Sequence, residues 1–220
     1  MGYTGTNRIM TSSDGVNWTA RTAPENNSWY SVTYGGGQFV AVGGDGTNRI
    51  MTSSDGVNWT ARTAPENNFW FSVTYGGGQF VAVGYSGTNR IMTSLDGVNW
   101  ITRAAPENNF WQSVTYGGGQ FVAVANSGTN RIMTSLDGVN WTARAAPENN
   151  SWQSVTYGGG QFVAVASSGA NRVMSSPDGV SWTARAVPEN NFWISATYGG
   201  GQLVVVGHSG TNRIMTSPCL

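Results

Sequence analysis

The sequence has 220 residues, which is long enough for a well-buried core in one domain. Its formal net charge is zero, from 11 Arg and 11 acidic residues with no Lys, so we expect no nucleic-acid partner. No apolar run approaches the roughly 20 residues of a membrane helix, and neither a membrane segment nor a signal peptide is expected. Cys219 is the single cysteine, which excludes an internal disulfide and leaves the redox compartment open.

The whole chain is a tandem array of one 41-residue repeat, and no insertion or deletion interrupts the period. Two tryptophan series mark this period: Trp18, Trp59, Trp100, Trp141 and Trp182, and Trp29, Trp70, Trp111, Trp152 and Trp193. The repeat units span approximately residues 5–45, 46–86, 87–127, 128–168 and 169–209, with a partial unit at 210–217. Each unit contains Gly-Gly-Gly, Pro and Asp-Gly, which exclude a pair of uninterrupted helices. We expect a single domain over residues 1–220.

In chain order, the first complete repeat predicts four short strands. The first, Trp29–Tyr34, is rich in β-branched and aromatic residues and ends at a tight turn of three glycines. The second, Gln38–Val42, is apolar on both faces, as expected for a strand buried on both sides. The third, Asn48–Ser53, follows a loop of Gly and Asp residues. An Asp-Gly turn leads to the fourth, Val57–Ala61, whose period-two alternation is typical of a half-exposed edge strand.

Four antiparallel strands per tandem repeat predict an all-β fold, a β-propeller with one four-stranded sheet per blade. The third-strand motif NRIMTS, once written NRVMSS, occurs six times, whereas the other strands occur five times. We therefore predict five blades in a ring that is closed by pairing of N- and C-terminal strands. Either Asn7–Ser12 or Asn212–Ser217 fills the third position of the closing blade, and the other copy is in excess. We expect mostly monomer, with some strand-swapped dimer.

The segment Ser12–Trp18, read Ser-Ser-Asp-Gly-Val-Asn-Trp, resembles the Asp-box, or bacterial neuraminidase repeat, of sialidase-like propellers. The family pattern is Ser-x-Asp-x-Gly-x-x-Trp, and this segment is one residue shorter between Asp and Gly. The resemblance implies a folding motif away from any active site. In this motif the Asp carboxylate accepts backbone N–H bonds, Gly adopts a positive φ and Trp packs beneath the turn. The architecture is also similar to that of five-bladed tachylectin-type propellers.

Neither catalysis nor a cofactor is predicted. Acid–base chemistry needs paired groups in unlike environments, whereas the carboxylates here recur in near-identical ones. The third-strand arginines, which begin with Arg8 and Arg49, suit salt bridges or solvated positions better than a catalytic cluster. The Asp-Gly turns lack the spaced carboxylates of a calcium loop, and there is no Cys/His cluster, so no metal site is expected.

A recurring Glu-Asn-Asn-x-Trp group is the candidate ligand-binding site. Its amides, carboxylate and aromatic plate would suit the hydroxyls and the apolar face of a sugar, and five copies would add avidity. The alternative is that these residues form the turn between blades, with the tryptophan packed between sheets. The candidate residues are Glu25, Asn26, Asn27, Trp29, Glu66, Asn67, Asn68, Trp70, Glu107, Asn108, Asn109, Trp111, Glu148, Asn149, Asn150, Trp152, Glu189, Asn190, Asn191 and Trp193.

The copies differ at positions around this group. The variable residues are Ser28, Phe69, Phe110, Ser151 and Phe192, then Tyr30, Phe71, Gln112, Gln153 and Ile194, and in the following loop Gly44, Tyr85, Asn126, Ser167 and His208. These variable positions are expected on one face of the propeller. The turn between the third and fourth strands, on the opposite face, varies too, for example at Ser54 and Leu95, so variation alone does not indicate which face binds a ligand.

The leading hypothesis is a non-enzymatic binding module: a multivalent, lectin-like or adhesion propeller on a bacterial surface, extracellular or cell-surface in location. Its expected partners are glycans or a protein. The alternative is a recently amplified or engineered repeat scaffold, a protein-interaction platform without a small-molecule ligand.

Overall fold

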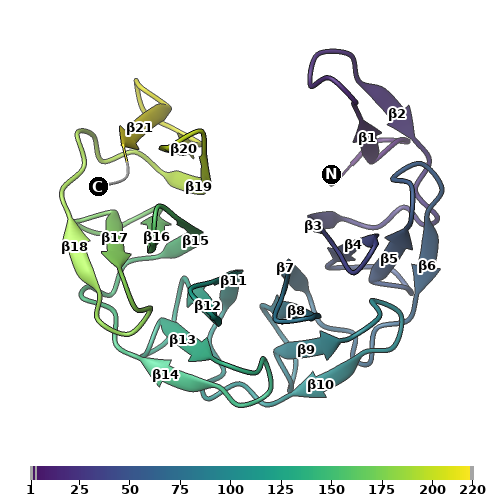
Figure 1. The fold of residues 1–220 in the computed structure, drawn as a ribbon, viewed down its shortest axis with the longest axis horizontal. Coiled ribbons are helices and arrows are strands. Elements are labelled where there is room, and N and C mark those ends of the chain that lie inside the picture. The colour runs from purple at the N-terminus through teal and green to yellow at the C-terminus, as the bar shows by residue number, and fades with distance from the viewer. Residues whose placement is uncertain (1, 3, 219–220) are drawn as a thin grey trace. The chain divides into compact units, whose positions relative to one another are not determined.

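The computed structural model describes residue 2 and residues 4–218, so Cys219 lies outside the described part. All regular elements of that part are β-strands (Figure 1). The chain divides into two compact units, Met1–Arg103 and Ala104–Leu220. No helix that is long and apolar enough to cross a membrane occurs among the described residues.

The first unit contains a two-stranded sheet and two four-stranded antiparallel sheets. The two-stranded sheet pairs β1 (Ile9–Thr11) with β2 (Thr19–Arg21). The next sheet has the order β3 (Trp29–Gly35), β4 (Gln38–Gly43), β5 (Ile50–Ser53) and β6 (Thr60–Arg62). The last has the order β7 (Trp70–Gly76), β8 (Gln79–Gly84), β9 (Ile91–Ser94) and β10 (Ile101–Arg103).

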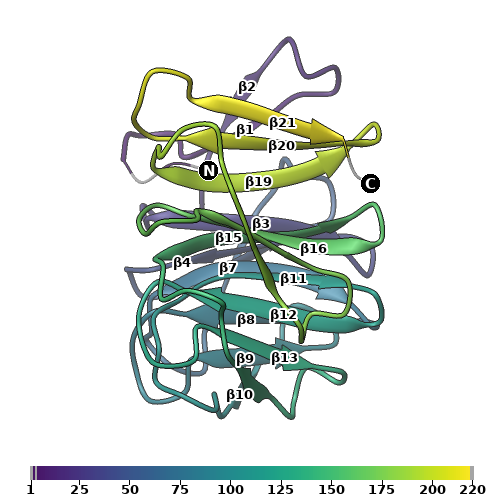
Figure 2. The same cartoon turned by 90° about the vertical axis from the view of Figure 1, so that its left-hand side faces the viewer.

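The second unit contains two four-stranded sheets and a three-stranded sheet. The first runs through β11 (Trp111–Gly117), β12 (Gln120–Ala125), β13 (Ile132–Ser135) and β14 (Thr142–Arg144). The second runs through β15 (Trp152–Gly158), β16 (Gln161–Ala166), β17 (Val173–Ser176) and β18 (Thr183–Arg185). The third contains β19 (Trp193–Gly199), β20 (Gln202–Gly207) and β21 (Ile214–Pro218), which Figure 2 shows as neighbouring strands.

The predicted repeat of four antiparallel strands is confirmed in four sheets, with one shared register. Tyr34 pairs with Phe39 between the first two strands, and the same Phe39 pairs with Ser53 of the third. Gly36 and Gly37 have φ values of 55° and 82° and form the turn between β3 and β4, whereas Gly35 of the predicted three-glycine turn belongs to β3. Such left-handed turns match the twist of the strands they join, which explains the invariant glycines.

The third and fourth strands of the repeat are shorter than predicted. β5 begins at Ile50, because the N–H of Asn48 donates a hydrogen bond to the Glu25 carboxylate and not to a strand. β6 begins at Thr60, because the Asp55 carboxylate takes the N–H of Val57 within the preceding turn. The predicted start of the fourth strand at Val57 is therefore wrong, whereas Trp59, Thr60 and Ala61 keep the predicted alternation of exposure.

Each interface between neighbouring sheets of a unit holds a hydrophobic cluster. Val40 and Ile50 of one sheet pack with Trp70, Phe80 and Trp100 of the next. The Trp29 series is buried throughout, as the alternative interpretation of the Glu-Asn-Asn-x-Trp group predicts. The Trp18 series is not uniform: Trp100 is 9% exposed, whereas Trp18 is 56% exposed. Burial of the second series therefore depends on the neighbouring sheet.

Third-position strands stand at both ends of the chain, as the six NRIMTS motifs predict. Within the described residues, β1 pairs with β2, and β21 pairs with β20. Pairing between N- and C-terminal strands is absent from the described sheets. Ring closure therefore stays a prediction.

Candidate functional site

The Glu-Asn-Asn-x-Trp group forms a hydrogen-bonded lock to the start of the third strand. The side chain of Asn48 donates to Glu25 Oε1, and its backbone N–H donates to Glu25 Oε2 at 3.1 Å. The side-chain amide of Asn27 donates to Asn48 O at 2.5 Å and to Glu25 Oε2 at 3.3 Å. We call these three residues and their repeats the Glu–Asn lock. Its other copies are centred on Glu66, Glu107, Glu148 and Glu189.

The tryptophan of each group belongs to the core. Trp29 donates from Nε1 to the carbonyl oxygen of Glu25 at 3.4 Å, and its ring is fully buried. Trp70, Trp111, Trp152 and Trp193 make the same bond and are buried to the same degree. None of these five rings offers an open face to a ligand in this structure.

The structure thus brings the residues of each Glu-Asn-Asn-x-Trp group together. Their arrangement is that of the alternative interpretation, a turn between sheets with a buried tryptophan. The first asparagine of each set, such as Asn26, is exposed; the second, such as Asn27, is buried; and the glutamate is partly buried. No buried side-chain N or O atom among the described residues lacks a hydrogen-bond partner. Sugar binding by these residues stays a prediction, and of each set only the first asparagine is classed as exposed.

The lock keeps its carboxylates ionised. At Glu148, the backbone N–H and the side chain of Asn171 lower the pKa of the carboxyl below its usual value. At Glu25, burial raises the pKa, but the hydrogen bonds from Asn48 and Asn27 outweigh it and the net shift is downward. These groups are therefore charged acceptors at neutral pH and are poorly suited to donate a proton.

The third-strand arginines connect one repeat to the next. Arg131 Nη1 donates to the carbonyl oxygens of Asn149 and Asn150 at 2.7 Å and 2.9 Å. Arg49 makes the equivalent bonds in the first unit, and Arg172 makes them further along the second. Sequence reasoning missed this role, because the acceptors are backbone atoms of another repeat.

In each Asp-Gly turn the aspartate carboxylate accepts backbone N–H groups, as predicted for this segment. Asp55 Oδ1 accepts the backbone N–H groups of Val57 and Asn58, each at 2.8 Å, and Oδ2 accepts the Asn58 side chain. Gly56 has a φ of 73°, and Trp59 Nε1 donates back to its carbonyl at 2.9 Å. Both oxygens of the carboxylate accept hydrogen bonds within the turn, so the aspartate has a structural role.

Four aromatic side chains at variable positions meet in the first unit. Tyr30 and Phe71, on the first strands of neighbouring sheets, stack with centroids 4.4 Å apart and planes at 20°. Tyr85 contacts Phe71 at 5.7 Å and Phe69 at 6.2 Å, and the Arg49 guanidinium lies 5.7 Å from the Phe69 centroid. We call Tyr30, Phe69, Phe71 and Tyr85 the aromatic cluster.

The second unit carries polar residues at several of the cluster positions, although Phe110 and Phe192 keep the ring of Phe69. Gln112 and Gln153 stand at the Tyr30 and Phe71 positions, and Gln153 Nε2 donates to Ser167 Oγ at 3.0 Å. Arg172 lies 6.0 Å from the ring centroid of Phe192, so the cation–π contact recurs there without the other rings. The residues at the variable positions therefore give the first unit an aromatic surface that the equivalent positions of the second unit do not form.

Comparisons with known proteins give the fold of the chain. No protein-family model matches it, and no curated protein matches it. A streptogramin B lyase structure is similar with a TM-score of 0.80 at 16% identity, covering 91% of this chain and 70% of the other. A chain of the nidogen/laminin complex has a TM-score of 0.72 at 14% identity, with 92% and 80% covered.

The structure of YCF48 bound to D1 peptide is similar with a TM-score of 0.67 at 16% identity, covering 93% of this chain and 69% of the other. At these identities the likeness concerns the fold alone. Together with the repeated four-stranded sheets, it shows that the chain has the fold of a β-propeller.

Proposed function

We propose that the protein is a non-enzymatic binding module that holds an apolar segment of a polypeptide partner on the aromatic cluster. The observation that carries this proposal is the convergence of Tyr30, Phe69, Phe71 and Tyr85, all at variable positions, in one place. Phe69 is 40% exposed, so the cluster is accessible from solvent.

Aromatic rings and arginine are the side chains that most often dominate protein–protein binding energy. The cluster combines four rings with Arg49, which is already held over Phe69 and anchored to Asn67 O and Asn68 O. Because these groups are fixed before a partner arrives, little side-chain entropy is lost on binding.

The constant Glu–Asn lock and its tryptophan argue against a sugar as the preferred ligand. The oxygens of Glu25 already accept bonds from Asn48 and Asn27, and the buried Trp29 cannot stack on a ring. A sugar site needs convergent polar groups with open valences beside an aromatic plate. Two of the similar structures are named as complexes with a protein or a peptide, which supports a polypeptide partner.

The non-enzymatic part of the proposal rests on the carboxylates. Glu25 and Glu148 both have lowered pKa values in equivalent locks, so neither of these two is set apart as the acid partner of a base.

The experiment uses a variant that borrows its residues from the other repeats. Tyr30→Gln, Phe69→Ser, Phe71→Gln and Tyr85→Asn are combined, because the chain already accommodates these residues at the equivalent positions. The control carries Phe110→Ser and Phe192→Ser, which lie outside the cluster. Peptides are selected from a random displayed library on the unaltered protein, and the affinities of the three proteins are compared.

Selected peptides should bind the unaltered protein and the control alike, and the cluster variant at least about tenfold more weakly, as for loss of a hot spot. Equal binding to all three proteins would overturn the proposal. A glycan array run in parallel separates the alternative: competable glycan binding that is lost in the cluster variant would replace the peptide with a sugar.

A further inference from the structure

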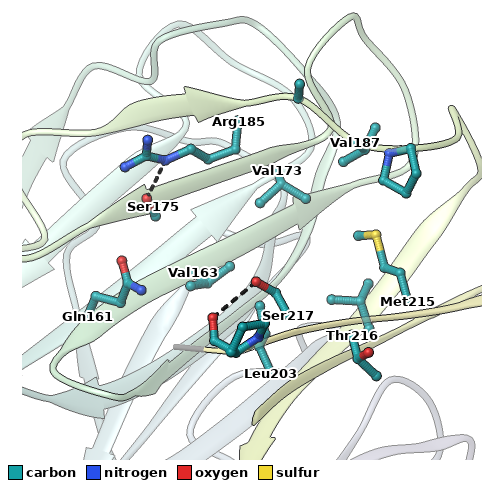
Figure 3. A pocket seen from close by; sticks show the side chains of 14 residues that line it. Gln161, Val163, Val173, Ser175, Arg185, Val187, Leu203, Met215, Thr216 and Ser217 are labelled. Atoms are coloured by element: carbon teal, nitrogen blue, oxygen red, sulfur yellow. Dashed lines mark hydrogen bonds between the residues drawn. The ribbon is translucent and has the colours of Figure 1, made fainter. Parts of the chain in front are cut away.

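The second unit contains a pocket of about 390 Å³ between the sheets β15–β18 and β19–β21. Figure 3 shows Val163 and Val173 on one side of it and Leu203 and Met215 on the other. Gln161 stands at its rim. The lining is therefore mainly apolar, and it lies beside the free edge of the last described strand, β21.

The equivalent space is filled where both neighbouring sheets have four strands. In the second unit, Gln120 Nε2 donates to Asp178 O at 2.7 Å, and a side chain added at Gly179 would meet Val122 and Gln120. Trp182 packs against the hydrophobic cluster that contains Val122. An Asp-Gly turn and its tryptophan thus cover the glutamine and valine of the preceding sheet.

The first unit repeats this arrangement. Gln38 Nε2 donates to Asp96 O, Gly97 faces Gln38 and Val40, and Trp100 joins the same hydrophobic cluster as Val40. Gln161 and Val163 are the equivalents of these residues at the pocket. The hydrophobic cluster that contains Val163 includes Trp193 but, among the described residues, no tryptophan from an Asp-Gly turn. The pocket lies where an Asp-Gly turn, its tryptophan and a fourth strand stand in the other repeats.

The first unit displays an uncovered copy of this turn and strand. The turn from Asp14 to Trp18 has its full set of hydrogen bonds and leads into β2. Its sheet has only two strands, so Met10, Val16 and Trp18 are 57%, 78% and 56% exposed. Two-stranded sheets are marginally stable alone, and exposed apolar side chains of this size favour a cover.

We propose that the pocket is a docking site for the segment Asp14–Arg21 of a second copy of this chain. Trp18 of that copy fills the apolar space, and β2 of that copy pairs with β21. The carbonyl oxygen of its Asp14 accepts a hydrogen bond from the side-chain amide of Gln161. The register follows the other repeats, in which Ile50 pairs with Arg62 and Thr52 with Thr60. Ile214 therefore pairs with Arg21, and Thr216 with Thr19, of the second copy.

Donor and acceptor are different surfaces, so the contact is heterologous and joins copies head to tail. This inference is independent of the aromatic cluster, because none of its residues lies in the donor or the pocket. Loss of peptide binding in the cluster variant leaves assembly unchanged.

The test is complementation between two full-length variants in sedimentation equilibrium. Trp18→Ala removes the donor side chain and keeps the pocket, whereas Met215→Arg fills the pocket and keeps the donor. The unaltered protein should associate as its concentration rises, and each variant alone should associate at least about tenfold more weakly. An equimolar mixture should form one-to-one dimers.

A synthetic peptide of residues 11–21 should compete with association, whereas the same peptide with Trp18→Ala should not. Association of the Trp18→Ala protein at the unaltered strength would overturn the proposal. So would a protein that is monomeric at every concentration; if its Trp18 is then shielded from a fluorescence quencher, the occupant is the same chain.

Discussion

The Gln120 side-chain amide donates a hydrogen bond of 2.7 Å to the carbonyl oxygen of Asp178, which lies 58 residues later in the chain. The bond ties the second strand of one sheet to the Asp-Gly turn of the next. Gln161 has the same place in the following sheet and lines the pocket. The glutamine at this repeat position is therefore bonded to a turn in one sheet, at Gln120, and lines a pocket in the next, at Gln161.

Replacing Gln120 with Ala should lower the free energy of unfolding by about 1 kcal/mol, because it leaves the Asp178 carbonyl without this donor. Gln161→Ala is the matched control and should change the stability of the isolated monomer by less than about 0.5 kcal/mol. Urea unfolding at low protein concentration checks both variants. Equal losses would show that the bond to the turn contributes nothing.

Asn150→Ala should destabilise the protein by about 1–3 kcal/mol, because it removes the buried amide that bonds to Asn171 O and Glu148. The side chain is only 4% exposed, so water does not replace it easily. Asn149→Ala, one residue earlier and exposed, should stay within about 0.5 kcal/mol of the unaltered protein. Chemical denaturation of the two variants side by side measures the difference.

Arg131→Ala should cost about 1 kcal/mol, since a partly exposed guanidinium loses its bonds to two backbone carbonyls. The Arg131 and Asn150 side chains hold the same loop, so their effects should not be additive. A double-mutant cycle in urea tests this coupling. Strict additivity of the two losses would contradict a shared role in positioning the loop.

Stability should fall in acid as the carboxylates of the turns and locks take up protons. Their pKa values are lowered in the folded chain, so their contribution is complete above the unfolded values near 4 and is lost as the pH falls through the folded ones. Thermal unfolding followed from pH 6 to pH 2 should show most of the loss below about pH 4. A melting temperature that is constant over this range would exclude the effect.

One repeat supplies an internal comparison for the acid effect. The backbone N–H of Ser181 and its neighbours lower the pKa of Asp178 to about 2, but Ser181 stands where the other turns have Asn. The Asn58 side chain is the second-largest cause of the lowered pKa of Asp55, whereas the Ser181 side chain contributes least to that of Asp178. Ser181→Asn should therefore lower the pKa of Asp178 further, which a carboxyl NMR titration of the two proteins can measure.

The fold was largely predictable because the period is unbroken and local chemistry is strong. Gly36-Gly37 and the Asp55-Gly56 turn are specified by residues within a few positions, and the buried second strand by its apolar composition. The strand at Val57 was predicted wrongly for a related reason. An alternating pattern does not reveal that a carboxylate two residues earlier captures the backbone.

The candidate site was less predictable because its contacts are distant in sequence. Glu25 bonds to Asn48, 23 residues away, and this partner converts a promising ligand group into a lock. Tyr30 and Phe71 meet only because first strands of neighbouring sheets lie side by side. Their variation was visible in the sequence, but their stacking was not.

The reach of the contacts has a consequence for how the protein is made. The Asp-Gly turn closes within six residues, the Glu–Asn lock spans 23, and the Gln120 bond spans 58, which is less than two repeats. A chain leaving the ribosome therefore completes each sheet soon after its residues emerge, and packs it when the next repeat follows. Short-range contacts of this kind favour rapid, sequential folding, so premature termination would leave the sheets already made intact.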